Sequence, residues 1–178
     1  MAKTARNLMT GLAATVTLFT AGQASATENE PMALVLHVDN YARVPPSYLE
    51  RAEKVTTAIY AAAGISVTWV NGETDLRMPS DGARHLRVLL LGEEMTNRKA
   101  RVGHVPDNVL GQAAAGATRA YIFTFRVRDV AIRNHRMFDA ALGRVIAHEI
   151  GHLLLPPNSH SSGSIMSETM DGWTPRAT

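Results

Sequence analysis

The chain has 178 residues, with 18 Lys and Arg against 16 Asp and Glu, and it contains no cysteine. This nearly balanced charge gives no reason to expect nucleic acid as a partner, which usually requires a strongly basic face. The absence of thiols excludes cysteine catalysis, thiolate zinc sites and disulfides. The fold must therefore depend on a hydrophobic core.

The first 26 residues have the pattern of a secretory signal peptide. Lys3 and Arg6 supply the positive start, residues 8–21 are mostly apolar and small, and Ala24-Ser25-Ala26 fits a cleavage site. We expect cleavage to leave residues 27–178 as one exported domain, secreted or periplasmic. No later stretch is long enough to cross a bilayer, so no membrane association is expected after cleavage.

Apolar runs, turn residues and helical spacing predict the elements of this domain in chain order. They are a strand at 33–38, a helix at 47–63 that Ser47 caps and Gly64 ends, strands at 65–70 and 86–91, a long polar connection at 92–108, a weak strand at 109–115, a stronger strand at 120–127, and a helical stretch at 129–155 that can break near 135–139.

This order predicts an α+β fold. An early helix and a late helix would pack against a twisted mixed sheet of about five strands, and a very short C-terminal part would follow. The strand-helix-strand unit at the start favours parallel pairing of the first two strands through a right-handed crossover.

The strongest chemical signal lies in the late helix, at His148-Glu149-Ile150-Gly151-His152. Histidines four residues apart lie on one face of a helix, one turn apart, so both imidazoles can bind one ion. Glu149 is offset around the helix and can take a proton from a metal-bound water. Because zinc lowers the pKa of such a water to about 7, the motif predicts a Zn²⁺-dependent hydrolase. His148 and His152 would be zinc ligands and Glu149 the general base.

A catalytic zinc usually has three protein ligands and one open position, so the helix pair needs a third ligand. His160 is the best candidate, because Pro156-Pro157 ends the helix and the chain can then turn back toward the ion. Glu168 is a competing candidate and Asn158 a weaker one. The predicted third ligand is therefore His160, with the other two still open.

These residues resemble the metzincin superfamily of zinc peptidases. Its motif is His-Glu-x-x-His-x-x-Gly-x-x-His, and a turn that contains methionine follows the motif. The segment from His148 to His152 matches the first part directly, and Ser164-Ile165-Met166-Ser167 is similar to the methionine turn. The resemblance is specific over residues 145–166 and only architectural before them.

The sequence departs from the metzincin pattern after the helix pair. Leu155 stands at the glycine position, and Asn158 stands at the position of the third histidine. If His160 is the ligand, the turn is two residues longer, and Pro156-Pro157 would make the bend that glycine normally makes. The departure therefore concerns the third ligand.

The resemblance implies an exported zinc metalloendopeptidase that acts on a peptide or protein substrate. An edge strand of the sheet would pair with the extended substrate, and its counterpart here is the segment 109–115. An alternative is an exported metal-binding or interaction protein with a degenerate peptidase site. A zinc hydrolase that acts on another amide is a third interpretation. The sequence specifies neither the oligomeric state nor the side-chain preference.

The sequence predicts no chemical role for the other four histidines. His37 lies on an apolar strand and is expected to be structural. His85, His104 and His135 are isolated in the sequence, and we expect them to be solvated.

Overall fold

The fold is described by a computed structural model, which describes residues 32–72, 82–161 and 164–167. The predicted signal peptide lies outside these residues. The elements are β1 (Ala33–Asn40), α1 (Pro46–Ala61), β2 (Ser66–Asn71), β3 (Arg84–Leu91), α2 (Glu93–Gly103), β4 (Gly111–Gln112), β5 (Arg119–Phe123), α3 (Thr124–Arg133) and α4 (Phe138–Leu154). Among the helices described, none is long and apolar enough to cross a membrane.

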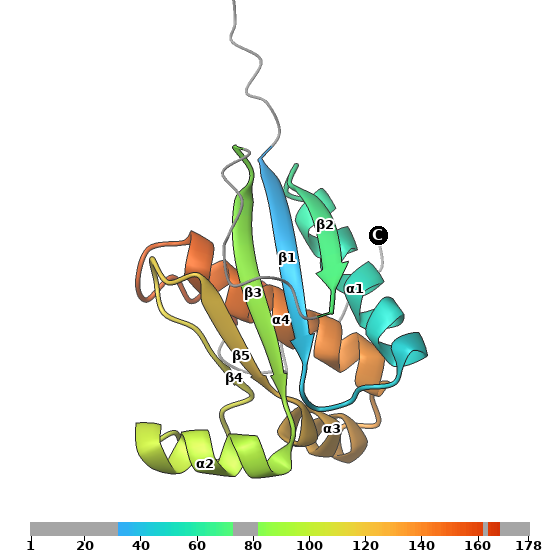
Figure 1. Ribbon diagram of the computed structural model, residues 1–178, viewed down its shortest axis with the longest axis vertical. Coiled ribbons are helices and arrows are strands. Elements are labelled where there is room, and N and C mark those ends of the chain that lie inside the picture. Colours follow the sequence, from blue (N-terminus) through green and yellow to red (C-terminus); the bar gives the residue numbers. More distant parts are fainter. Residues whose placement is uncertain (1–31, 73–81, 162–163, 168–178) are drawn as a thin grey trace, which may run out of the picture. The chain divides into compact units, whose positions relative to one another are not determined.

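The five strands form one mixed sheet in the order β2-β1-β3-β5-β4 (Figure 1). The first four are parallel to one another, and the short edge strand β4 pairs antiparallel with β5. The predicted α+β class, the mixed sheet of five strands and the parallel pairing of β1 with β2 are therefore confirmed.

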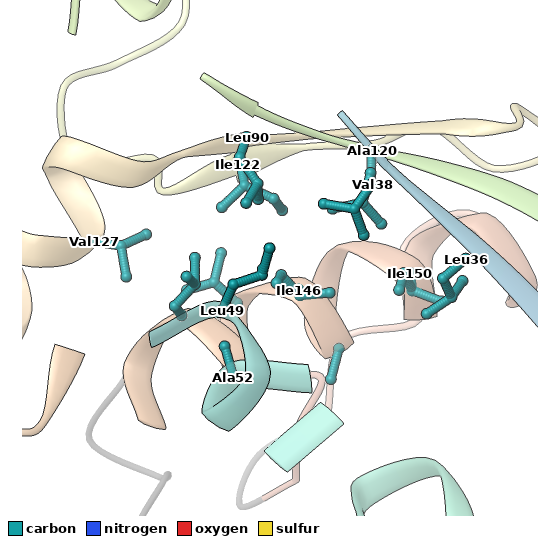
Figure 2. Close-up of a cluster of buried hydrophobic side chains, with 14 of the residues drawn as sticks. Leu36, Val38, Leu49, Ala52, Leu90, Ala120, Ile122, Val127, Ile146 and Ile150 are labelled. Carbon is teal, nitrogen blue, oxygen red and sulfur yellow. The ribbon is translucent and has the colours of Figure 1, made fainter. Parts of the chain in front are cut away.

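The hydrophobic core lies between one face of the sheet and the helices α1 and α4. Alternate residues of the central strands point to this face, because side chains of a strand alternate between its two sides. Figure 2 shows these strand side chains opposite apolar side chains of α1 and α4, among them Leu36, Val38, Leu90, Ala120, Ile122, Leu49, Ala52, Ile146 and Ile150.

Helices α1 and α4 make an unusually close contact at Gly143. A Cβ atom at this position would lie 2.4 Å from the carbonyl oxygen of Ala52, so a larger residue does not fit. Two hydroxyl groups of α1 donate hydrogen bonds to α4: Thr56 Oγ1 to the carbonyl of Gly143 and Tyr60 Oη to the carbonyl of Ala147, each at 2.8 Å. The early helix therefore directly supports the helix that carries His148, Glu149 and His152.

The predicted polar connection at 92–108 was wrong, because most of it forms helix α2. The helix has acidic Glu93 and Glu94 in its first turn and basic Arg101 in its last, which suits the helix dipole. It buries only Thr96 and Ala100, one turn apart. A helix with so narrow a contact face lacks the apolar stripe on which the sequence interpretation depended.

The predicted strand at 120–127 was also wrong in its second half. β5 ends at Phe123, and α3 begins at Thr124, whose hydroxyl donates to the carbonyl of Leu91 at 2.7 Å. Val127 and Ala131 are buried at helical spacing, although the aromatic and β-branched residues before them favoured a strand. The predicted break before the last helix is confirmed, since α3 and α4 are separate.

Two smaller boundaries also differ. α1 begins at Pro46 without a side-chain cap, so Ser47 is inside the helix; proline is well suited to the first helical turn. The weak strand predicted at 109–115 is reduced to the two residues of β4. Gly111 pairs with Ile122 and Gln112 with Tyr121. The end of α1 before Gly64, which has a φ of +72°, agrees with the prediction.

Candidate metal centre

Three histidine side chains converge beside helix α4. The Nε2 atom of His152 lies 3.1 Å from Nε2 of His148 and 3.1 Å from Nε2 of His160. The candidate ligand atoms of all three lie within 4.8 Å of one another. A tetrahedral zinc ion with Zn–N distances near 2.05 Å would hold its nitrogens about 3.3 Å apart. The nitrogen separations of the three predicted ligands are therefore close to those that a single metal ion requires.

His160 reaches the helix pair through a tight turn. α4 ends at Leu154, and Asn158 then adopts a φ of +62°, which reverses the chain. The hydroxyl of Ser159 donates to the carbonyl of Pro156 at 2.6 Å and closes this turn. Asn158 itself is exposed and does not line the cavity at the histidines, so the alternative ligand is not brought there. Glu168, the other alternative, lies outside the described residues.

His148 is oriented by its second ring nitrogen. Its Nδ1 atom lies 2.8 Å from the carbonyl oxygen of Ile165. Since a carbonyl can only accept, Nδ1 carries the proton, and the lone pair of Nε2 is left pointing at the other two histidines. Hydrogen bonds of this kind are a regular feature of histidines that bind metals.

The residues around Ile165 form the predicted turn beneath the histidines. The amide of Ser167 donates to the carbonyl of Ser164 at 3.1 Å, and Met166 is buried. A Cβ atom at Gly151 would lie 2.4 Å from Met166 Sδ. Glycine in the middle of the motif therefore lets the methionine pack directly against α4.

The histidines of the helix pair are poised to stay neutral. Burial and the nearby His148 and His160 lower the pKa of His152 to about 4. Burial also lowers the pKa of His148, although the hydrogen bond to Ile165 acts in the opposite direction. A neutral imidazole keeps the lone pair that a metal ion requires.

Glu149 lines the same cavity as the three histidines, which has a volume of about 480 Å³. Its side chain is buried, and burial raises its pKa to about 8. A Cβ atom at Gly111 would lie 2.6 Å from both Cγ and Oε1 of Glu149. The edge strand β4 thus touches the carboxyl, and only glycine leaves room for it. Gly111 lies in the weak strand predicted at 109–115, and a glycine inside a strand can mark such a close approach of another group.

The segment 108–113 forms one wall of the cavity, and Arg126 holds it in place. The buried guanidinium of Arg126 donates to the carbonyls of Pro106 at 2.7 Å and Val109 at 3.0 Å, and it pairs with Asp107 at 3.0 Å. Sequence reasoning missed this residue, because it lay within a predicted strand. Without the fold, no local signal links it to a segment about twenty residues earlier.

The remaining histidines fall into two groups. His104 and His135 are exposed, as predicted. His85 is buried and not solvated, which corrects the prediction. Its Nδ1 atom lies 2.9 Å from Nε2 of His37 on the neighbouring strand, since β1 and β3 pair with Val35 opposite His85. This pair lies on the sheet face opposite the core and agrees with a structural role for His37.

Comparisons with known proteins do not identify a family. No protein-family model matches the chain, and no curated protein is significantly similar to it. The function must therefore be inferred from the geometry of the site.

Proposed function

We propose that this protein is an exported zinc-dependent peptidase, with His148, His152 and His160 as metal ligands and Glu149 as general base. One observation carries the proposal: three Nε2 atoms converge on one point of a cavity that a buried carboxyl also lines. The histidine donor set and its spacing suit zinc, and three protein ligands leave the fourth position open. The open position is what separates a catalytic zinc site from a structural one.

The chemistry divides between the ion and the chain. Zinc, when bound, would supply a water of lowered pKa and a positive charge for a carbonyl oxygen. Glu149 takes the proton of the attacking water and gives it to the leaving amine nitrogen. Burial raises the pKa of Glu149 when no cation is nearby. A bound zinc ion would lower that pKa again, because a nearby positive charge favours the ionised carboxylate that a general base requires.

The edge strand β4 gives the proposed site a means of holding a peptide. On one side β4 pairs with β5, and its other side is the edge of the sheet. An extended peptide added there would be held by main-chain hydrogen bonds. Because Gly111 touches Glu149, a peptide on this edge would pass next to the catalytic carboxyl. A peptide or protein is therefore the substrate that the site suits best.

The metzincin resemblance supports the same proposal. The resemblance implies a helix with two histidines, a methionine turn beneath it and an edge strand that pairs with the substrate. The helix, the turn and an edge strand occur together here, with Met166 against Gly151 and β4 against Glu149. The longer turn before His160 is the departure from the pattern, and its closure by Ser159 offers a physical account of how it reaches the site.

One experiment distinguishes the peptidase from the two alternatives, a metal-binding protein with a degenerate site and a zinc hydrolase of another amide. Zinc content and cleavage of a peptide library would be measured for the wild type, Glu149→Gln and His160→Ala. We expect Glu149→Gln to keep its zinc and lose about 10²- to 10⁴-fold in cleavage rate, the usual contribution of a general base. We expect His160→Ala to bind zinc more weakly.

The contrary outcomes are equally specific. Bound zinc without Glu149-dependent cleavage of any peptide would favour the degenerate binding protein or the hydrolase of another amide. Full zinc occupancy in His160→Ala would remove that residue from the ligand set.

A further inference from the structure

The outer face of the sheet, opposite the core, carries two adjoining hollows next to the edge strand. Their volumes are about 510 and 380 Å³, and they share Lys99, Gln112 and Tyr121. Residues of the turn between β4 and β5 line one hollow, and residues of α2 and of the end of β3 line the other. α2, which the sequence did not predict, thus contributes Lys99 to both hollows and lines one side of the second.

The charge of these hollows is one-sided. Arg98, Lys99 and Arg119 line them, and no acidic residue among those that the structure describes does so. The Nζ atom of Lys99 lies 3.7 Å from the ring centroid of Tyr121, a cation–π contact that holds the ammonium group over the sheet. Lys99 makes no ion pair with any residue in the described ranges. The hollows therefore have a positive potential that is not neutralised within the described part of the chain.

The edge strand connects this face with the proposed catalytic centre. Gly111 points to the inner side, against Glu149, and its neighbour Gln112 points to the outer side, beside Lys99. A peptide paired with β4 would alternate in the same way, with every second side chain on the outer face. Those side chains would lie one strand spacing from Gln112, which is within reach of a lysine.

We propose that Lys99 and Arg119 form a subsite for an acidic side chain of the peptide held on β4. The subsite selects Asp or Glu at positions that alternate with those facing the metal ligands. Gln112 and Tyr121 form the floor of the subsite, and the carboxylate of the peptide offsets the positive charge of Lys99 and Arg119. The inference rests on the proposed function, since that function places a peptide on this edge.

A binding experiment tests the subsite without requiring turnover. The Glu149→Gln protein, loaded with zinc, would be applied to an array of short peptides, each present in pairs that differ only by Glu or Gln at one position. We expect the Glu peptides to bind about two- to five-fold more tightly, the range of an exposed ion pair, with the difference falling as salt rises. In parallel, peptides cleaved by the wild type should show acidic residues at alternate positions.

Charge reversal on α2 provides the matched comparison. Lys99→Glu should abolish or reverse the preference for Glu, whereas Lys99→Arg should keep it. Arg101→Glu makes the same charge change at an exposed position of the same helix that lines neither hollow, and it should also keep the preference.

The outcomes separate this inference from the proposed function. If the wild type cleaves peptides but Glu and Gln partners bind equally, or if Lys99→Glu and Arg101→Glu behave alike, the acidic subsite is wrong and the peptidase stands. If the array shows the Lys99-dependent preference but the wild type cleaves nothing, the subsite stands and the peptidase is wrong.

Discussion

The molecule contains two histidine clusters that differ in the direction of their ring nitrogens. In the pair on the sheet, Nε2 of His37 faces Nδ1 of His85 at 2.9 Å, so the two rings satisfy each other. In the triad beside α4, three Nε2 atoms face one another. Because the proton of His148 lies on Nδ1, at most two of these three Nε2 atoms can carry a proton. Proximity of histidines is thus common to both clusters, while convergence on a point is particular to the triad.

The clusters also differ in the nearest buried carboxyl. Asp39 lies near the sheet pair and is 3.4 Å from Arg87, which offsets its charge. Glu149 beside the triad has no ion pair or hydrogen bond to another side chain in the described ranges. A carboxyl kept without a partner in a buried position is costly, and such groups are concentrated at functional sites.

The largest expected effect comes from removing one member of the convergent cluster. His152→Ala should weaken zinc binding by more than about 100-fold, since even the loss of an outer-shell partner costs up to that amount. His85→Gln, which breaks the other cluster, should leave zinc affinity unchanged in the folded protein. Titration with a zinc-chelating dye would measure both. Equal zinc affinity in the two variants would contradict the proposal that the triad, and not the His37–His85 pair, binds zinc.

A smaller effect is expected when Glu149 is displaced but retained. Gly111→Ala puts a methyl group where Cγ and Oε1 of Glu149 lie, so the carboxyl must move. We expect peptide cleavage to fall about 100-fold, as a displacement near 1 Å can cause, with zinc content unchanged.

Gly92→Ala is the control for this substitution. There a Cβ atom would meet only Ala42, at an ordinary 3.7 Å, and φ is −73°. Wild-type cleavage by Gly111→Ala would mean that β4 does not constrain the carboxyl.

The smallest expected effect is a loss of stability at acidic pH that arises from the His37–His85 pair on the sheet. Burial, His85 and Arg87 lower the pKa of His37 from 6.5, and Asp39 only partly opposes them. Below pH 6.5 the unfolded chain therefore binds more protons than the folded one, and the free energy of unfolding falls as pH falls. One group can contribute no more than about 1.4 kcal/mol per pH unit.

Urea denaturation in the presence of a chelator would measure this slope. His37→Gln should have a shallower decline than the wild type between about pH 7 and the folded pKa. Identical slopes would show that His37 does not contribute to the pH dependence of stability.

The success of the sequence predictions depended on how local each feature is. The placement of His148 and His152 one turn apart on one helix, and the offset of Glu149 around that helix, follow from helix geometry alone. The parallel start of the sheet follows from the order of apolar segments. Each of these features is determined within one or two elements, so periodicity was sufficient to find it.

The features that were missed depend on contacts between distant segments. The buried environment of His85 requires β1 as its neighbour, and Arg126 acts on a segment that the sequence places far from it. α2 has little apolar surface, so hydrophobic periodicity could not reveal it. Its acidic start, Glu93 and Glu94, and its basic end, Arg101, are the signal that the sequence offers for this helix.

The hydrogen bonds from Thr56 and Tyr60 determine how α4 is rotated about its own axis. They meet carbonyls one turn apart on the side where Gly143 brings the helices together. Each residue of a helix advances the direction of its side chain by about 100°, so a modest rotation of α4 would carry both ring nitrogens away from His160. The hydroxyl groups of Thr56 and Tyr60 on α1 therefore help to orient the imidazoles of His148 and His152 toward His160. If the triad binds a metal as proposed, substitutions of Thr56 or Tyr60 would alter its affinity without touching a ligand.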